Sequence, residues 1–554
     1  MQKRLLLAAA LSLAVLALWE VLIPKPRPPA GNPVAPAGAV SAAPTGVPAA
    51  APTDAAVPAP STAAAQSAQK ESLPPPVAGS AEEAVTAEND VVRMTFSNRG
   101  AVLRSLLLLR HTDEEKKPLD LVRQLPPPAQ RPFAIDFPGN PELTRRVGDA
   151  LFAVDRVSNR ALRFSFADGA VAVTKEVRLL DGYLFDIKVS VVGPAYVLLA
   201  GTGLRNPSPE DLASRYVMPA TAVASAATGF ERARPEKLEK PVQWPLAERG
   251  FAGIEDNYFL EVLLPASPAN AVAFSVPLKD RDGKPAPTIA AGVTGSGTLS
   301  ARAYYGPKDV EILEGLKLGL ERTVDFGWYG ILARPLLWLL KRTYGWVGNF
   351  GVAILLVTLA IRILLFPLMH KSYSSMKKMQ KLAPKMNAIR DKYKKAKSDA
   401  GQRQKMNEEL MKLYQAEGYN PMSGCFPILL QLPILVAFYN VLSRSIELRH
   451  APFVLWITDL SAVDRTYVLL ILMTVTMYIQ QAMTPTTADP TQKKIFMAMP
   501  LVWGFFLKDM PSGLVLYWLF SNVLTILQQA LIGKMGSKDE PNVEKPAKLK
   551  RARA

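Results

Sequence analysis

The sequence predicts a polytopic α-helical membrane protein with six transmembrane helices and a large all-β domain on the outer side of the membrane. Two observations over its 554 residues support this prediction. The mean hydropathy is positive (+0.10) although the first hundred residues are rich in Pro and Ala, so later segments must be more apolar than a soluble core. In the middle of the chain, short runs alternate between apolar and polar residues, which is typical of antiparallel strands.

The residue counts exclude several classes of site. The single cysteine, Cys425, excludes an internal disulfide framework, a cysteine-rich zinc site and an iron–sulfur cluster. The three histidines, His111, His370 and His450, are too few and too scattered for an HExxH metalloprotease. The chain has neither a GxxxxGK[ST] phosphate-binding loop nor a GxSxG nucleophile elbow. We therefore expect no catalytic residue, no metal, no cofactor and no enzyme activity.

The N-terminal segment, residues 1–23, has two cations followed by an apolar run that closes on Trp19 and Glu20. It fits either a cleaved signal peptide or a retained anchor. Because a cleavage site needs small residues where this run has Trp and Glu, we expect an uncleaved transmembrane anchor with a cytoplasmic N-terminus. Residues 24–85 are rich in Pro and Ala and nearly lack large apolar side chains, so they predict a disordered tether.

Residues 86–325 predict a large antiparallel β domain. Short alternating runs are separated by Gly, Pro, Asn and Asp, and they include residues 91–96, 162–166 and 184–189. The length is ample for a core of its own. The composition then changes, because residues 326–346 mix aromatic, apolar and cationic side chains. This mixture predicts an amphipathic helix that lies at the membrane surface.

Residues 347–533 contain five further apolar segments that predict membrane-spanning helices, at 347–369, 425–442, 467–483, 495–507 and 513–532. The run at 495–507 is only thirteen residues long, or roughly 20 Å against a hydrocarbon core of about 30 Å. Either its flanks snorkel to the surface or the bilayer is thinner beside it. Both interpretations stay open.

Charge predicts the orientation of these spans. The loop 370–424 carries thirteen Lys and Arg against five Asp and Glu, and the tail 534–554 is also basic. If the chain crosses the membrane six times, the loop 370–424 and the tail 534–554 both lie on the same side of the membrane as the N-terminus. Because cytoplasmic loops carry the excess of Lys and Arg, both termini are expected in the cytoplasm and the β domain outside it.

The basic loop 370–424 is predicted to form a helical hairpin with a hinge at 394–401. Its apolar residues recur at helical spacing, and four of them are methionines: Met376, Met379, Met386 and Met406. Such a stripe is usually the seam between two helices. Methionine is also flexible and polarizable, so these side chains are candidates for touching apolar partners. The cations of the hairpin and tail are either exposed to water, where they only set the orientation of the chain in the membrane, or they bind anionic lipid or ribosomal RNA.

Arg362 is the most informative residue, because it lies inside an apolar run. A cation at such a depth costs roughly 2.5–3.5 kcal/mol. It either snorkels to the nearby surface or lines a hydrated recess. Thr358, four residues earlier, shares its helix face. The other four predicted spans within 347–533 hold no Asp or Glu but several neutral polar residues, among them Gln431, Asn440, Gln480, Asn522, Gln528 and Gln529. An unpaired cation among neutral polar residues favours the recess.

Several motifs resemble the YidC family of bacterial membrane protein insertases, within the wider YidC/Oxa/Alb group. They lie in unbroken order at 350–367, 420–427, 455–461, 483–486 and 511–518. The resemblance covers about residues 326–533. The anchor and exported domain are similar to the Gram-negative type, which has a large periplasmic domain. One difference is Trp518, which stands where the family pattern leads us to expect a second tyrosine beside Tyr517.

The resemblance implies a fold and a function. The β domain would be a periplasmic β-supersandwich, and five spans would form an insertase core with a hydrophilic groove centred on Arg362. Thr358, Phe506 and Trp518 match positions that line this groove or the path along which a client helix slides. The protein would reside in the inner membrane, receive nascent integral membrane proteins at its cytoplasmic hairpin, and act alone or with the Sec translocon.

Two other functions fit parts of the sequence. A secondary transporter could use Arg362 for an anionic substrate, although no repeat of spans and no acidic proton relay is visible. A carbohydrate enzyme on a membrane anchor could use the β domain, in which His111 is the only histidine.

Overall fold

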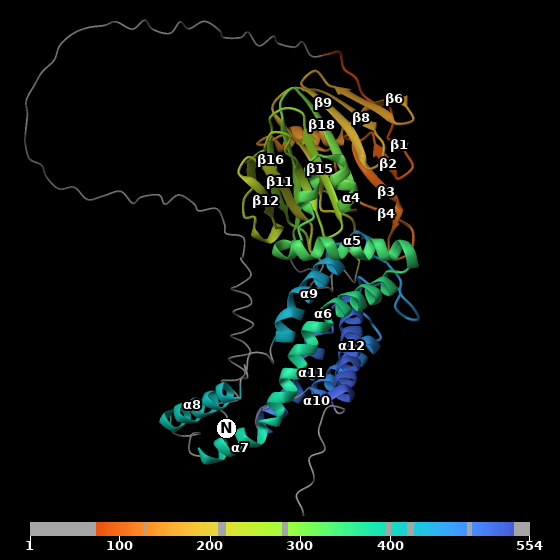
Figure 1. Cartoon of the computed structure of the whole chain (residues 1–554). Coiled ribbons are helices and arrows are strands. Elements are labelled where there is room, and N and C mark those ends of the chain that lie inside the picture. The colour runs from red at the N-terminus through yellow and green to blue at the C-terminus, as the bar shows by residue number, and fades with distance from the viewer. Residues whose placement is uncertain are drawn as a thin grey trace, which may run out of the picture. The chain divides into compact units, whose positions relative to one another are not determined.

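The computed structural model describes residues 74–126, 129–208, 218–279, 286–393, 400–417, 426–484 and 490–536 (Figure 1). The predicted anchor at 1–23, most of the tether predicted at 24–85 and most of the tail predicted at 534–554 lie outside these residues. So does most of the predicted hinge at 394–401. The described chain forms a β domain followed by a helical part.

The β domain contains eighteen strands and one helix within the described residues. Their bounds are β1 (Ala84–Glu88), β2 (Val92–Ser97), β3 (Val102–Thr112), β4 (Pro118–Asp120), β5 (Ile135–Asp136), α2 (Pro141–Asp149), β6 (Ala153–Ser158), β7 (Ala161–Ala167), β8 (Ala172–Leu179), β9 (Leu184–Val192), β10 (Tyr196–Thr202), β11 (Thr221–Ala226), β12 (Gly229–Ala233), β13 (Val242–Pro245), β14 (Ala252–Glu255), β15 (Phe259–Pro265), β16 (Asn270–Val276), β17 (Thr288–Gly295) and β18 (Thr298–Pro307).

These strands form three antiparallel sheets. The largest has the order β12-β11-β14-β15-β18-β9-β8-β7-β6, the second β13-β16-β17-β10-β5, and the third β1-β2-β3-β4. Strand β9 shows the alternation that predicted the domain, because Phe185, Ile187 and Val189 are buried while Lys188 between them is exposed. The predicted antiparallel β domain is confirmed. It begins before residue 86, since β1 starts two residues earlier and Val77 forms a bridge with a residue of β7.

The core lies between the sheets and is rich in aromatic side chains. Phe133 stacks against Phe96 of the small sheet at 6.1 Å and against Tyr305 of the largest sheet at 5.5 Å. Its ring also meets the edge of Phe185 at 5.6 Å. Offset and edge contacts of this kind add to the free energy gained by burying the rings. The cluster therefore fixes the two sheets against each other.

Two ionisable side chains are buried in this core without an opposite charge beside them. Lys175 donates hydrogen bonds to the carbonyls of Gly100 (2.7 Å), Ala101 (3.2 Å) and Phe133 (2.8 Å), and its burial lowers its pKa to about 7. Glu261 on β15 is fully buried, and neither carboxyl oxygen has a partner among the described residues. Burial raises the pKa of Glu261 well above its usual value, and nearby acidic groups add to the effect.

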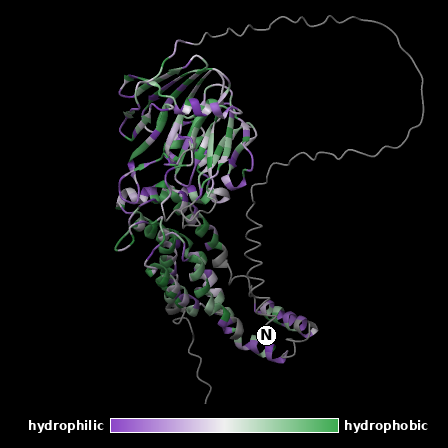
Figure 2. Ribbon diagram, turned by 180° about the vertical axis from the view of Figure 1, so that it is seen from behind, coloured by the Kyte–Doolittle hydropathy of each residue, from purple (hydrophilic) through white to green (hydrophobic). Residues whose placement is uncertain are grey.

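The helical part begins after β18. Its helices are α4 (Val310–Leu316), α5 (Gly330–Val347), α6 (Phe350–Lys381), α7 (Ala383–Lys392), α8 (Ala400–Ala416), α9 (Phe426–Arg444), α10 (Val468–Met483), α11 (Pro490–Leu507) and α12 (Ser512–Gly536). Helix α5 has two distinct faces, as predicted for an interfacial helix: Leu336 and Leu340 are buried, whereas Trp338 and Trp346 are 64% and 75% exposed. Figure 2 shows mainly hydrophobic residues along α6 and α9–α12.

Two described helices are long and apolar enough to cross a membrane, namely α6 and residues Ser512–Ile532 of α12. Helix α10 is apolar but shorter. The count of six spans therefore stays a prediction. Helix α6 continues from the predicted span, which ends at residue 369, into the predicted helical hairpin as far as Lys381, because the helix is interrupted only before Pro384, at the start of α7.

The β domain and the helical part are joined by polar contacts around α5. Lys341 of α5 forms ion pairs with Glu311 and Glu447, both at 3.0 Å, and with Asp309 at 3.7 Å. Asp309 and Glu311 lie at the start of α4, directly after β18, while Glu447 follows α9. In addition, the Asn257 side chain donates to the Ser443 carbonyl of α9 at 3.1 Å. These bonds tie α5 and α9 to the β domain.

The buried carboxyl of Glu261 makes the stability of the β domain depend on pH. In the unfolded chain this group loses its proton near its usual pKa of 4.5, whereas in the folded domain it keeps the proton to a higher pH. The folded state then binds more protons, so the free energy of unfolding should fall as pH rises above 4.5, by at most about 1.4 kcal/mol per pH unit.

Glu261→Gln should therefore lack this fall, because the amide does not ionise. The measurement is denaturant unfolding of the purified full chain over a pH series. The matched control is Glu142→Gln, since Glu142 is exposed. Wild-type and Glu261→Gln curves that run parallel at all pH values would contradict the prediction.

Candidate functional site

Arg362 lies on α6, in the middle of a helix that is apolar on most sides. The helix is started by Asn349, whose side chain accepts a hydrogen bond from the Val352 amide at 3.0 Å. Ile363 and Leu364 are 65% and 78% exposed and form the outer face, whereas the Arg362 side chain is only partly exposed. Helical geometry therefore turns the guanidinium toward α12, which packs against α6.

Ser521 of α12 receives this guanidinium. One terminal nitrogen of Arg362 donates to the Ser521 carbonyl at 3.3 Å and also to the Ser521 hydroxyl. Gln431 of α9 donates to the same hydroxyl at 3.4 Å and to the hydroxyl of Tyr517. Tyr517 is buried and stacks on Phe438 of α9, with ring centroids 4.0 Å apart. Arg362, Ser521, Gln431 and Tyr517, the polar cluster, thus connect three helices.

The polar cluster carries one positive charge and no negative charge. Among the described residues, no Asp or Glu forms an ion pair with Arg362. Its partners are a carbonyl and a hydroxyl, which satisfy hydrogen bonds but leave the charge uncompensated. Within the same described ranges, no three His, Cys, Asp or Glu side chains come together to hold a metal ion. The cluster can therefore bind an anionic or polar group by charge and hydrogen bonding.

Three other polar residues predicted for the site lie outside the polar cluster. Thr358 shares the inner face of α6 but is 2% exposed, and its hydroxyl donates to the Ile354 carbonyl of its own helix at 2.6 Å. Its hydroxyl is thus used within the helix, as is common for threonine. Asn522 of α12 faces α10, where it donates to Thr476 at 3.4 Å. Gln528 is two turns further along α12, and its amide nitrogen has no partner in the described chain.

The predicted aromatic residues separate into three surroundings. Tyr517 belongs to the polar cluster. Trp518, its neighbour on α12, lies with its ring 6.3 Å from that of Trp503 on α11. Phe506 is 61% exposed on α11, beside Phe505, which is 67% exposed. Only Phe506 presents most of its ring at the surface, so it alone of the three is open to an apolar partner.

The predicted hairpin is formed by α7 and α8. Lys385 pairs with Glu417 at 2.6 Å and Lys392 pairs with Glu409 at 3.0 Å. The earlier lysine of α7 pairs with the later glutamate, and the later lysine pairs with the earlier glutamate, so the two helices run antiparallel. Met386 is buried between them and its sulfur accepts a hydrogen bond from Tyr414.

The other hairpin methionines differ in position. Met376 and Met379 lie on the extension of α6, before α7 begins, and Met406 lies on α8. All three side chains are partly exposed. Met386 is therefore a seam residue, while the other three have surface available for a partner.

Sequence reasoning missed Ser521 and Phe438. Ser521 follows Tyr517 by four residues and so lies on the same face of α12, which is the signal that could have identified it. Phe438 is one of several aromatic and apolar residues in α9, and nothing in its spacing distinguishes it from a lipid-facing side chain.

Comparison with known proteins identifies the family. Residues 84–339 match the family described as YidC periplasmic domain, and residues 342–539 match the family described as 60Kd inner membrane protein. The membrane protein insertase YidC of Pelobacter propionicus is 34% identical, over 97% of this chain and 99% of the relative. The chain belongs to the YidC family of membrane protein insertases.

Some relatives of higher identity match over only part of their length. The chain spans about half of the YidC insertase of Geobacter metallireducens, to which it is 47% identical over 51% of this chain and 52% of the relative. A solved structure of an active YidC insertase is 18% identical, covering 82% of this chain and 94% of that one, with a TM-score of 0.36. The family consists of insertases rather than enzymes, and its members are inner-membrane proteins with a periplasmic β domain and a helical C-terminal part.

The contacts of Tyr517 predict how its substitution affects stability. Tyr517→Phe keeps the stack on Phe438 but removes the acceptor of the Gln431 hydrogen bond, so it should lower the free energy of unfolding by about 0.5–1.5 kcal/mol. Tyr517→Ala also loses the buried ring and should cost about 3–5 kcal/mol. Thermal unfolding of the purified protein in detergent measures both. Equal losses for Phe and Ala would contradict the packing role of the ring.

Proposed function

We propose that this chain inserts transmembrane segments of other proteins, its clients, and that the polar cluster receives their polar parts. The observation that supports this most is Arg362, a cation on an apolar helix whose described partners are all neutral. In a medium of low dielectric constant, such a charge attracts a client carboxylate far more strongly than water would allow. The client would then be the transient partner that the chain itself does not supply.

The arrangement in the membrane is part of the same proposal. Residues 1–23 form a retained anchor, five spans within 347–533 form the insertase core, and both termini lie in the cytoplasm. Support comes from the excess of Lys and Arg in 370–424 and 534–554. The β domain of 86–325 is then periplasmic, and 24–85 is its tether to the anchor.

Client contacts are proposed for two further surfaces. The exposed ring of Phe506 on α11 and the ring of Trp518 on α12 would lie along the path of a client helix. Met376, Met379 and Met406 would touch apolar client segments on the cytoplasmic side, where methionine adapts to different shapes. The basic faces of the hairpin and tail suit anionic membrane lipids and the ribosome. The proposal that the chain acts together with the Sec translocon is supported only by its membership of the family.

Substitutions of Arg362 test the role of the charge. For a client with an acidic translocated tail, Arg362→Lys should keep much of the insertion rate, since the positive charge remains. Arg362→Ala should lower that rate about tenfold, which corresponds to ~1.4 kcal/mol. Arg362→Glu should be worse, because like charges repel strongly in a low-dielectric site. Insertion into proteoliposomes at matched protein levels measures each rate.

A client with an uncharged tail is the control and should respond less to all three substitutions. If Arg362 only snorkels, Arg362→Ala would be neutral or mildly stabilising. Equal insertion of the acidic-tailed client by wild type and Arg362→Ala would remove Arg362 from the mechanism.

Deletion of the hairpin tests client capture. Replacing residues 383–416 by a short flexible linker should block capture while the remaining helices stay folded, because the described ion pairs of α7 and α8 are with each other. The control is the exchange Lys392→Glu with Glu409→Lys, which keeps the pair and the net charge. Crosslinking of a stalled client measures capture, and normal crosslinking by the deletion variant would show that the hairpin is dispensable.

A further inference from the structure

The outer loop, residues 445–467 between α9 and α10, carries an exposed apolar tip at residues 454–456. Leu455 is 83% exposed, more than any other large apolar side chain in the described part of the chain. Its neighbours Val454 and Trp456 are 46% and 39% exposed. No Asp, Glu, Lys, Arg or His occurs from residue 451 to residue 458. The tip is therefore a continuous apolar surface without a charge of its own.

The backbone of the tip is strained at its most exposed residue. Leu455 has a φ of 56°, in the left-handed region that glycine and asparagine adopt far more readily than leucine. Two backbone hydrogen bonds close the turn around it, from the Phe453 amide to the Ile457 carbonyl at 3.0 Å and from the Ile457 amide to the Val454 carbonyl at 3.1 Å. Neither packing within the chain nor backbone preference explains a leucine at this position. Strain of this kind commonly serves a function.

The outer loop is bonded to the first residues of α6 and α12, the two described helices that are long and apolar enough to cross a membrane. At α6, the Asn349 side chain donates to the Phe453 carbonyl at 2.9 Å, directly beside the tip. At α12, the Ser512 amide donates to the Ala462 carbonyl at 2.7 Å. A helix that crosses a membrane ends near the membrane surface, so the tip is held at that level.

The side chains closest to Leu455 in exposure all lie on surfaces that are expected to meet lipid. Trp328 (81%) and Ile331 (80%) lie at or just before the start of the interfacial helix α5, and Leu364 (78%) lies on the outer face of α6. Helix α5 also ends two residues before Asn349, the residue that is bonded to the base of the tip. The tip thus continues the apolar surface that α5 and α6 form.

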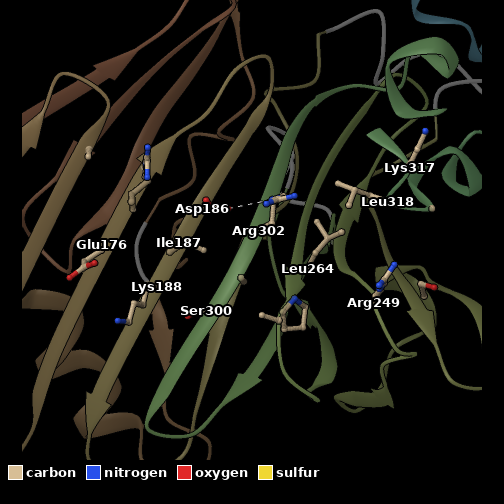
Figure 3. Close-up of a pocket in the computed structure, with 18 of the residues that line it drawn as sticks. Glu176, Asp186, Ile187, Lys188, Arg249, Leu264, Ser300, Arg302, Lys317 and Leu318 are labelled. Carbon is tan, nitrogen blue, oxygen red and sulfur yellow. Dashed lines mark hydrogen bonds and ion pairs between the residues drawn. The ribbon is translucent and has the colours of Figure 1, made fainter. Parts of the chain in front are cut away.

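An exposed apolar side chain of the β domain has different surroundings. Val157 of β6 is 60% exposed, but it lines a cleft of about 1130 Å³ over the largest sheet (Figure 3). Seven cations and three acids also line this cleft, among them Glu176, Lys188 and Arg302. Such charges keep a surface in water, because their transfer to hydrocarbon is costly. Val157 is therefore a control for an apolar side chain that does not meet lipid.

We propose that the tip inserts into the outer leaflet of the membrane, where Val454 and Leu455 contact lipid hydrocarbon and Trp456 lies at the level of the headgroups. Transfer of apolar side chains from water to hydrocarbon is favourable, and tryptophan is enriched at membrane surfaces. The indole N–H of Trp456 donates a hydrogen bond to Asp464, so its polar edge is satisfied within the loop. Contact with lipid explains both the exposure and the strain of Leu455. The inference rests on the proposed arrangement in the membrane, but not on the insertion of clients.

The test uses the full chain in vesicles of phosphatidylethanolamine and phosphatidylglycerol. The single cysteine, Cys425, is replaced by serine, and Val454→Cys then carries an environment-sensitive fluorophore. Its fluorescence is compared between vesicles of ordinary lipids and vesicles of lipids brominated in their acyl chains, because bromine quenches only a fluorophore that it contacts. We expect strong quenching of the label at residue 454. The control label at Val157→Cys should be quenched little.

Two substitutions of Leu455 separate lipid contact from folding. Leu455→Asn suits the positive φ better than leucine does, so the turn should persist while the apolar contact is lost. Quenching of the label at residue 454 should then fall, because the ratio of inserted to withdrawn tips drops about tenfold or more. Leu455→Phe keeps an apolar side chain and should keep the quenching. Thermal unfolding of both variants in detergent checks that they fold alike.

Three outcomes would overturn the inference. They are equal quenching of the labels at residues 454 and 157, unchanged quenching in Leu455→Asn, and shielding of the label at 454 that depends on the ratio of protein to lipid but not on bromine. The third outcome would show that a second copy of the chain covers the tip. Failure of the insertase proposal would be recognised separately, as unchanged insertion by Arg362→Ala while the label at 454 was still quenched.

Discussion

The helix that carries Arg362 packs against α5 and α9, and these two helices are tied to the β domain by polar contacts. Asn257 donates to the Ser443 carbonyl and Arg449 to the Thr112 carbonyl, while Lys341 of α5 joins three acids at the same junction. The ammonium of Lys341 reaches Glu311 and Glu447 at 3.0 Å and Asp309 at 3.7 Å, so one cation links the start of α4, directly after β18, to the end of α9. Because α5 also packs against α6 and α9, this ion cluster orients two of the three helices that hold the polar cluster. An ion cluster shared by three acids fixes geometry more firmly than isolated surface pairs do.

Several cations of the chain have an opposite charge within reach, as Lys341 does and as Arg205 does, which pairs with Asp256 at 2.7 Å. Arg362, like Lys175 in the β domain, has only neutral partners among the described residues. Its hydrogen bonds to Ser521 hold the guanidinium in place without neutralising it. An ion pair with a buried acid would cancel the positive electrostatic potential of Arg362 that could attract a client. Neutral hydrogen-bond partners leave that potential in place. The energetic cost of the uncompensated cation is thus the source of its capacity to bind an anionic group.

Local patterns in the sequence predicted much of this structure, whereas the features that they did not predict depend on contacts between residues far apart in the chain. The alternation in β9 and the apolar runs in α6 and α12 involve residues close together in the chain, so the sequence shows them directly. The span and the hairpin after it were both predicted to be helical, but their union into one continuous helix α6 was not predicted, because charged residues such as Lys377 either continue a helix or begin a new one. Glu261 was not foreseen as buried, since a single acid among apolar residues has no distinct spacing. Arg362 was identified by its unusual surroundings, but its partner Ser521 depends on how α6 and α12 pack.

The polar cluster and the tip of the outer loop share one physical feature with opposite chemistry. Arg362 is a cation on an apolar helix, and Leu455 is an apolar side chain exposed at a strained turn. Each is unfavourable for the chain alone and becomes favourable when its surroundings supply what is missing, namely negative charge for Arg362 and hydrocarbon for Leu455. The two contacts differ in duration. A client leaves after insertion, so a single cation in a small, shielded site must act strongly over a short distance. The membrane is always present, so the apolar contact of the tip can hold the outer ends of α6 and α12 level with its surface throughout.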